Sequence, residues 1–323
     1  MEEFNYNNIC SDLLSSLNGK QKETILRRFG LGKTNRETLE AIGRDFGVCR
    51  ERVRQIQVTG LEKVKRKIKK HDKVFQFFSN YLKSFGGLKK EDILLEELGG
   101  NGNKNEVYFL LSLKEPFQRI NENKDFHSYW MINKASFQSV KKTVDVLSAQ
   151  LRKTKKPLSL KQLKIGLKGK VLKSFLEVSK KIQQNEDKLY GLSSWPEINP
   201  RGIKDKAYLV FKKTNKPLHF REVTELIENS HVQTVHNELI KDPRFILVGR
   251  GTYALLEWGY YPGQVKDVIS SILKEAKKPL AKNEILKEVL RQRIVKENTI
   301  LLNLNNKNYF LKNSKGEYTI KEI

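Results

Sequence analysis

Four polar side chains, spaced so that they share one face of a helix, are the residues with the clearest capacity for chemistry. They are Arg50, Glu51, Arg54 and Gln55. At 100° per residue the opposite face of that helix is apolar and comprises Val53, Ile56, Gly60 and Val64. Arginine bonds bidentately to guanine, glutamine to adenine, and a carboxylate accepts from cytosine. The set therefore predicts a face that reads bases in a DNA major groove.

A second helix is expected immediately upstream to hold this face in place. Leu39, Ile42 and Phe46 recur with helical spacing and form one apolar stripe, and Thr38 is a suitable N-cap. Gly47 tolerates positive φ and opens a three-residue connection, 47–49, before the next helix begins at about Arg50. This arrangement predicts a helix-turn-helix.

Three segments in this region carry a family resemblance. ILRRFGL (25–31), TLEAIGRDFGV (38–48) and RERVRQI (50–56) resemble, in order and spacing, region 4 of the bacterial primary-type sigma factors of RNA polymerase. The resemblance implies recognition of the promoter −35 element and docking on the flap of the polymerase β subunit. It implies base contacts for Arg50, Glu51 and Gln55, and backbone contacts for Arg54 and Thr38. The implied polymerase-binding residues, on the helix near the flap-facing surface, are Ile25, Leu26 and Phe29.

The sequence departs from the family pattern at three positions. Cys49 stands where the family usually has threonine and is a poorer helix cap. Thr59 and Gly60 replace the usual lysine and alanine, and glycine lowers helix stability. We expect modest affinity for the groove. The alternative for this segment is a helix-turn-helix that serves only as a protein-interaction fold.

The charge balance favours a polyanionic partner. The 323 residues contain 62 Lys and Arg against 37 Asp and Glu, a formal net charge of +25, and the sequence pI is about 9.8. Such an excess favours double-stranded DNA through counterion release, without sequence preference, and it is spread along the chain rather than confined to one tail. No apolar run is long enough for a membrane span and the N-terminus lacks a secretory signal, so a cytoplasmic protein is expected. Two cysteines exclude a disulfide framework and a paired-cysteine zinc site, and the five histidines have no ligand-like spacing.

The rest of the chain contains a tandem repeat of about 64 residues. Trp130, Trp195 and Trp258 are each preceded 13 positions earlier by an apolar residue, Phe117, Ile182 or Phe245, and the chain end repeats this with Phe310 and Ile323. Strand, turn and strand patterns lie between the members of each pair, with Tyr190, Tyr253 and Tyr318 at matching positions. Upstream stand the related phrases KKPLSLKQL, NKPLHFREV, KKPLAKNEI and the weaker GGLKKEDIL. Each unit reads as helix, extended segment, two helices and a hairpin, which is the order of a winged helix.

These patterns predict a mainly α fold with small β-hairpins: an N-terminal helix-turn-helix domain plus tandem winged-helix domains. The expected boundaries are 1–72, 73–132, 133–198, 199–260 and 261–323. The third and fourth repeats resemble the HARE-type winged-helix module shared by the delta subunit of bacterial RNA polymerase and several chromatin or restriction-linked proteins, chiefly over 234–258. The first two repeats match more loosely, and the first lacks the tyrosine position.

In the third repeat, a helix over 232–241 and the tip of the following hairpin predict a second DNA-contacting surface. Its expected residues are Gln233, His236, Asn237, Lys241 and Arg250. Docking of protein partners is the alternative, because winged helices often serve that purpose and the delta-like resemblance points to it for some of the four.

No pattern favours an enzyme, a cofactor or a small-molecule substrate. GLGKT (30–34) is not a P-loop, because Arg27 stands where the first glycine is required and the string follows a helical pattern. Neither a nucleophile elbow nor a histidine and carboxylate constellation is found. A metal site is not expected.

The sequence is best interpreted as a sigma-like, DNA-binding transcription factor that associates with the RNA polymerase core. The alternative is a polymerase-bound, delta-like accessory protein whose winged helices dock proteins. A nuclease or base-modifying enzyme is a third hypothesis without an acidic site to support it. Only about 16 residues precede Leu17, so we expect no promoter-melting region.

Overall fold

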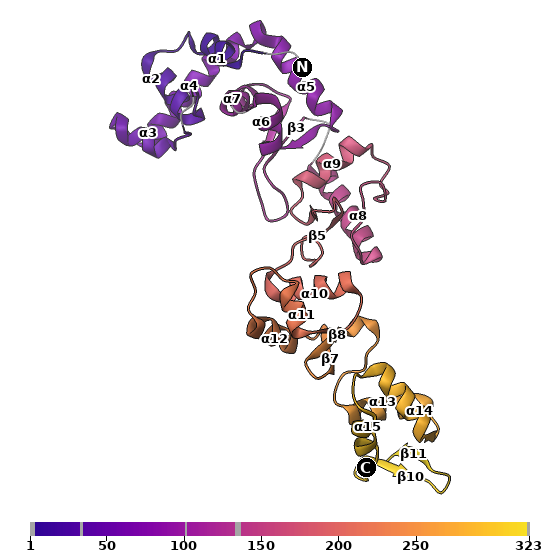
Figure 1. Ribbon diagram of the computed structural model, residues 1–323. Helices are drawn as coiled ribbons and strands as arrows, with labels where there is room; N and C mark the ends of the chain where they lie inside the picture. Colours follow the sequence, from indigo (N-terminus) through magenta and orange to yellow (C-terminus); the bar gives the residue numbers. More distant parts are fainter. Residues whose placement is uncertain (1–3, 33–34, 101, 133–136, 322–323) are drawn as a thin grey trace. The chain divides into compact units, whose positions relative to one another are not determined.

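The computed structural model describes residues 4–32, 35–100, 102–132 and 137–321. It is mainly helical with short antiparallel sheets, which confirms the predicted fold class (Figure 1). The chain divides into two compact units, Met1–Ser194 and Trp195–Ile323. The first unit holds the helix-turn-helix and two of the repeats, and the second unit holds the other two.

The N-terminal part, here called the HTH module, consists of helices joined by short connections, with no strand among its described residues. Its elements are α1 (Tyr6–Leu14), α2 (Gly19–Phe29), α3 (Leu39–Phe46), α4 (Arg50–Lys67) and the 3-10 helix η1 (Ile68–His71). The Thr38 hydroxyl caps α3 by accepting from the Ala41 amide at 3.1 Å, and α3 ends at Gly47 with φ 66°. Helix α4 begins at Arg50, and Cys49 makes no side-chain cap. The predicted helix-turn-helix is confirmed.

Three of the four repeats share one topology. The first module comprises α5 (Asp72–Ser84), β1 (Leu88–Lys90), α6 (Glu91–Gly99), α7 (Lys104–Leu113), β2 (Phe117–Ile120) and β3 (Tyr129–Ile132). The third comprises α10 (Gly202–Thr214), β6 (Leu218–His219), α11 (Phe220–Glu225), α12 (Val232–Lys241), β7 (Phe245–Gly249), β8 (Thr252–Leu255) and η2 (Leu256–Trp258). The fourth comprises α13 (Val265–Ala276), β9 (Leu280–Ala281), α14 (Lys282–Gln292), α15 (Glu297–Leu304), β10 (Phe310–Lys312) and β11 (Glu317–Ile320). In each, the last strand lies between the first and the second, as the winged-helix order requires.

The second module departs from this plan. It comprises α8 (Phe137–Thr154), α9 (Gly169–Val178), β4 (Ile182–Gln184) and β5 (Tyr190–Leu192). Turns replace the expected middle helix over the described residues 155–168, and Leu158 forms only a single bridge to Tyr190. Gly166 adopts φ 71°, a conformation that ends helical structure, so the helical spacing of the leucines here is not realised.

The strand registers correct the expected alignment of the tryptophans. Phe117, Ile182, Phe245 and Phe310 each begin the first hairpin strand and are buried. Tyr190, Tyr253 and Tyr318 pair with the residue two positions beyond that start, and in the first module the equivalent position is Trp130, opposite Arg119. Trp130 therefore occupies the tyrosine position and is not the counterpart of Trp195 and Trp258. A longer loop between β2 and β3 produced the matching spacing of 13.

The expected boundary at residue 72 does not separate two cores. One apolar cluster runs from Tyr6 to Ile132 and includes Ile25 and Phe29 of α2 together with Phe109 of α7. The rings of Phe29 and Phe109 meet edge to face with centroids 5.0 Å apart, and α7 packs against α1, α2 and α4. The HTH module and the first module thus fold around a common interior.

Polar contacts complete this interface. Asn105 Nδ2 donates to the Gly30 carbonyl at 2.7 Å, and the Gly32 amide donates to the buried Glu106 carboxylate at 3.2 Å. The Arg36 guanidinium lies 3.7 Å from the centre of the Tyr108 ring and donates to Asn105 Oδ1. The Gly30 carbonyl and the Gly32 amide, at the end of α2, would otherwise lack hydrogen-bond partners at this interface. These contacts therefore fix the geometry of the junction.

Phe109→Ala tests whether the two modules unfold together. Removing this fully buried ring should destabilise the first unit by about 3–5 kcal/mol. Because the ring lies in a shared core, urea denaturation should show the HTH module and the first module melting in one transition. Leu302→Ala in the fourth module, where the side chain is 75% exposed, serves as the control and should change stability little. Selective unfolding of the first module, with the HTH module left intact, would contradict the shared core.

Candidate nucleic-acid interface

The polar face of α4 is presented to solvent as predicted. Arg50, Glu51, Arg54 and Gln55 are all exposed, whereas Val53, Gly60 and Val64 are buried against α2 and α3 and Ile56 is half-buried. The helix runs for 18 residues, so its first two turns project this face while its later turns anchor it in the core. No described part of the chain covers these four side chains to the point of burial.

Two pairs order the side chains on this face. Arg54 donates to both carboxylate oxygens of Glu51, with its Nη2 at 2.7 Å, and Arg52 donates to Gln55 Oε1 at 3.2 Å. The hydrogen bond from Arg54 lowers the pKa of the Glu51 carboxyl below its ordinary value, so this group is ionised at neutral pH. Both partners are more than half exposed, so exchanging the pair for contacts to bases costs little. Arg50 stands at the start of the helix beside them.

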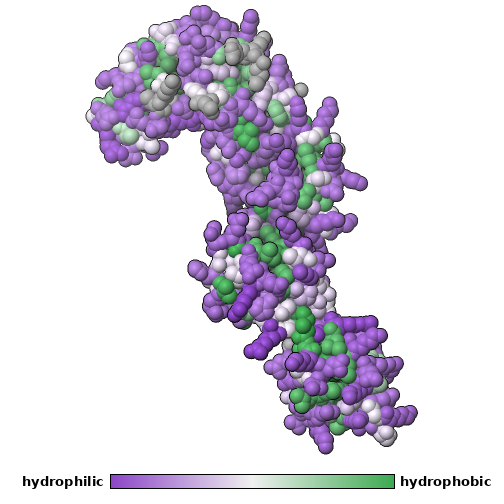
Figure 2. Space-filling view, in the orientation of Figure 1, coloured by the Kyte–Doolittle hydropathy of each residue, from purple (hydrophilic) through white to green (hydrophobic). Residues whose placement is uncertain are grey.

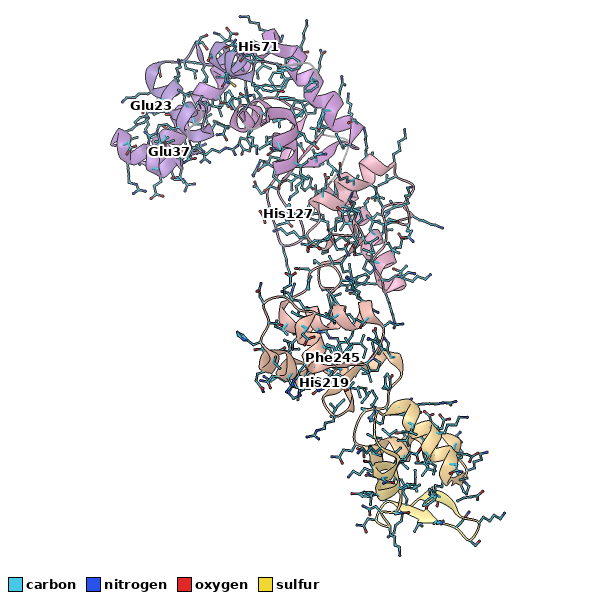
Figure 3. All side chains as sticks on the ribbon, viewed as in Figure 1. Glu23, Glu37, His71, His127, His219 and Phe245 are labelled. Atoms are coloured by element: carbon cyan, nitrogen blue, oxygen red, sulfur yellow. The ribbon has the colours of Figure 1, made fainter. Side chains whose placement is uncertain are left out.

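Helix α3 is held in position by Arg27 of α2. Its guanidinium donates to Glu37 at 2.9 and 2.6 Å and also binds Asp45, while Arg28 donates to the Glu37 carbonyl. Figure 3 shows Glu37 and Glu23 in this region; Glu23 lies 3.5 Å from the same guanidinium. The hydrogen bond from Arg27 lowers the pKa of Glu37, so this pairing is intact at neutral pH and is lost as the pH falls through that pKa. These contacts set the angle between α2 and α3.

The turn between α3 and α4 depends on Gly43, which sequence reasoning did not single out. A Cβ built on Gly43 would lie 2.7 Å from the Val48 carbonyl oxygen, a backbone atom. Gly47 provides the left-handed residue of the same turn. The sequence signal for this close approach was the presence of a glycine, Gly43, four residues before Gly47.

Gly43→Ala should separate α3 from α4, because neither the new methyl group nor the carbonyl can move freely. We expect a loss of about 1–3 kcal/mol in unfolding free energy and a matching loss of DNA affinity. The matched control is Gly19→Ala, at a helical glycine with nothing within 4 Å of a built Cβ, which should be neutral or slightly stabilising. Denaturant melts and duplex titrations of both variants provide the measurement. Equal stability of the two variants would show that the turn tolerates a wider approach.

The third module presents some, but not all, of its predicted residues. Helix α12 has the predicted bounds, and Gln233, Asn237, Lys241 and the hairpin-tip Arg250 are exposed. His236 is the exception: its ring stacks on Phe220 at 4.3 Å and meets the edge of Tyr253 at 6.0 Å. His236 is half-buried and its ring is engaged in packing within the module, so it is less available to DNA than the other four residues.

The expected polymerase-binding residues lie mainly inside the protein. Ile25 is fully buried, Phe29 is buried against Tyr108 and Phe109, and Leu26 is partly buried. Ile25 and Phe29 cannot touch a partner while this core is intact, because Ile25 packs beside Gly60 of α4 and Phe29 packs against Tyr108 and Phe109 of α7. This corrects the implied direct role of those two residues and leaves Leu26 partly accessible.

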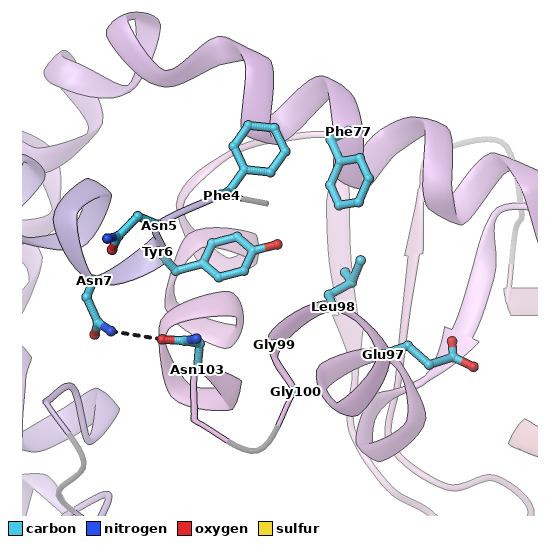
Figure 4. A pocket seen from close by; sticks show the side chains of 10 residues that line it. All are labelled: Phe4, Asn5, Tyr6, Asn7, Phe77, Glu97, Leu98, Gly99, Gly100 and Asn103. Carbon is cyan, nitrogen blue, oxygen red and sulfur yellow. Dashed lines mark hydrogen bonds between the residues drawn. The ribbon is translucent and has the colours of Figure 1, made fainter. Parts of the chain in front are cut away.

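A cavity of about 730 Å³ lies where α1 meets α5 and the turn between α6 and α7. Figure 4 shows the rings of Phe4, Tyr6 and Phe77 on one side and the hydrogen bond from Asn7 to Asn103, 3.0 Å long, on another. The one carboxylate among the described lining residues, Glu97, is engaged by Tyr81 and by Lys89 at 3.0 Å. Since the lining offers no convergent set of free polar groups, we assign no ligand to it.

Among the described residues, no group of three or more His, Cys, Asp or Glu side chains has the geometry of a metal site. Within the same residues, every helix is too short or too polar to cross a membrane.

Comparison with known proteins agrees with the geometry of the HTH module. Residues 13–66 match the family model described as Sigma-70, region 4. The chain is 42% identical over 52 residues to RNA polymerase sigma factor RpoS of Coxiella burnetii, which covers 16% of this chain and 15% of that protein. It is 43% identical over 54 residues to RNA polymerase sigma factor SigA of Listeria monocytogenes, or 17% and 14% of the two chains. SigA of Listeria innocua gives the same values.

These similarities concern the HTH module only. The chain matches about 15% of the length of the relatives named here. The residues of the family model, 13–66, fall within the segment from α1 to α4. The N-terminal segment is a Sigma-70 region 4 domain.

Proposed function

We propose that this protein is a cytoplasmic, sigma-like DNA-binding transcription factor that recognises a promoter element through α4 and associates with RNA polymerase. The observation that carries the proposal is the exposed set Arg50, Glu51, Arg54 and Gln55 on the second helix of a Sigma-70 region 4 domain. In this scheme Arg50, Glu51 and Gln55 contact bases, while Arg54 and Thr38 contact the DNA backbone. The exposed α12 residues and Arg250 are candidates for a second contact with the duplex.

Polymerase association is part of the same proposal. Because Ile25 and Phe29 are buried, it requires an accessible surface on the HTH module. We infer that α2 contacts the β flap through its partly accessible side, which includes Leu26, and that Ile25 and Phe29 act indirectly by fixing α2 against α7. The relatives that match this segment are named as RNA polymerase sigma factors, which supports a polymerase partner.

Gln55→Ala tests base reading. If the carboxamide reads one base, the variant should lose about 1–3 kcal/mol of discrimination at a single position of the site, with little change at the others. The target sequence is first obtained by selection from a random duplex pool, and binding is then measured on single-base variants. Gln118→Ala, an exposed glutamine on β2, is the control and should leave discrimination unchanged. A uniform loss on all sequences would count against base reading by Gln55.

The second test asks whether the protein recruits RNA polymerase without melting the promoter by itself. The intact chain should recover polymerase subunits in a pull-down that survives nuclease treatment. With core polymerase alone it should give no permanganate-reactive thymines at the promoter, and reactivity should appear when another sigma factor is supplied. Open-complex formation by the chain and core polymerase alone would refute the recruitment-only proposal.

One observation favours a second candidate, a polymerase-bound accessory protein whose winged helices dock proteins. Helix α7 occupies the position that enters DNA in winged-helix proteins, yet it is buried against the HTH module. The first module therefore already uses this surface for packing. Exposed apolar side chains on the fourth module, including Leu302 and Leu311, fit the same use, and Figure 2 shows apolar colour on that module. A random-pool selection that yields no preferred sequence would favour this candidate.

A further inference from the structure

The positive charge is distributed very unevenly among the modules. Residues 73–132 contain eight Lys and Arg and eight Asp and Glu, so the first module has no net charge. Residues 133–198 contain fifteen Lys and Arg against five Asp and Glu, a net charge of +10 out of the total of +25. The excess is not confined to one tail, as expected, but the second module carries the largest share.

Within this module exposed cations lie on α8, on the turn segment that replaces the middle helix and at the start of α9. The exposed cations of this surface, here called the lysine surface, are Lys141, Lys142, Arg152, Lys153, Lys155, Lys156, Lys161, Lys164, Lys168 and Lys170. Among the described residues none of the ten has a carboxylate within ion-pair distance. The one acidic residue between 137 and 173, Asp145, lies 3.7 Å from Lys181.

The turn segment is held on α8 in a defined position. Gln150 Nε2 donates to the Gln162 carbonyl at 3.2 Å, and Gln150 Oε1 accepts from the Lys164 amide at 3.3 Å. Leu158 and Leu163 are buried beneath the segment, and Gln162 Oε1 accepts from both the amide and the hydroxyl of Ser159. The lysines of the turn are therefore presented by a backbone that is anchored to α8 at Gln150.

The composition of this surface selects among polyanions. Residues 138–173 contain no aromatic residue and no histidine, so the surface has no platform on which unpaired bases could stack. Closely spaced, unpaired ammonium groups instead suit the regular phosphates of a duplex, where each contact releases a condensed counterion. The base-reading face of α4 belongs to the same compact unit.

We propose that the lysine surface of the second module binds the phosphate backbone of double-stranded DNA independently of sequence. This inference rests on the proposed function for its choice of duplex DNA as the polyanion. It adds a separate site to that function: α4 discriminates among sequences, and the lysine surface supplies salt-dependent affinity on any sequence. The middle helix of the winged-helix plan is replaced here by a cationic turn that contacts phosphates.

The test is a four-lysine variant of the full chain, Lys153→Gln, Lys156→Gln, Lys161→Gln and Lys164→Gln. Binding to a labelled duplex of arbitrary sequence is measured by fluorescence anisotropy across a range of salt concentrations. If these lysines contact about four phosphates, the slope of log K against log salt should become shallower by roughly 3 to 4. The affinity should fall about tenfold or more at low salt. All four side chains are exposed, so the melting temperature should be unchanged.

The fourth module offers a matched control, because it repeats the Lys-Lys-Pro-Leu phrase at 277–280. The control variant removes the same number of exposed charges through Lys274→Gln, Lys278→Gln, Lys282→Gln and Lys287→Gln. It should keep most of the salt slope. Equal losses in both variants would overturn the proposal, because they would reflect net charge alone. A loss confined to single-stranded RNA, measured in parallel, would also overturn it.

The result for the lysine surface can be distinguished from the result for base reading by Gln55. On the selected site and on arbitrary duplex, the lysine variant should lose the same factor in affinity, so the ratio of the two stays intact. Gln55→Ala should reduce the ratio and leave the salt slope unchanged. Failure of the lysine variant to weaken binding therefore refutes the lysine surface without touching the role of α4, and the reverse also holds.

Discussion

The packing of α7 against α2 and α4 is the constraint on which the first unit depends. Phe109 and Phe29 meet in a core that neither module could complete alone, and the buried Ile25 side chain contributes from α2. Burial of these apolar groups stabilises both modules at once, because either half left alone would expose them to water. Helix α4 is thereby attached to a body larger than three helices. A defined position for α4 follows from this arrangement.

The four related modules differ in the surfaces that they expose. In the first, the helix that could enter a groove is buried and the net charge is zero. In the second, the middle helix is missing and the surface is strongly cationic. In the third, α12 exposes Gln233, Asn237 and Lys241. In the fourth, α15 exposes Leu302. The modules therefore differ in the side chains that they expose, although three of the four share one topology.

Much of the fold was predictable because local rules agreed with the tertiary result. The capping hydroxyl of Thr38, the glycine at 47 and the apolar stripe all pointed to one helix-turn-helix, and the structure has it at those residues. The repeat predicted the hairpin starts at Phe117, Ile182, Phe245 and Phe310 for the same reason. Trp130 was misassigned because a longer loop preserved its spacing while moving it to another position in the strand. The repeat order also predicted a middle helix in the second module that the structure lacks over residues 155–168, where Gly166 adopts positive φ.

What the amino-acid order determined by itself was the set of chemical groups on α4 and their common direction, because 100° per residue leaves no other arrangement for Arg50, Glu51, Arg54 and Gln55. Only the tertiary structure decided which apolar residues remain available to partners. Ile25 and Phe29 have the same helical spacing whether they face solvent or a neighbour. Ile25 packs beside Gly60 of α4, and α7, some 80 residues later in the chain, covers Phe29. The aromatic stacking of His236 likewise depends on Phe220, from a different helix. Burial is a property of contacts between distant segments, and the periodicity of one segment does not contain it.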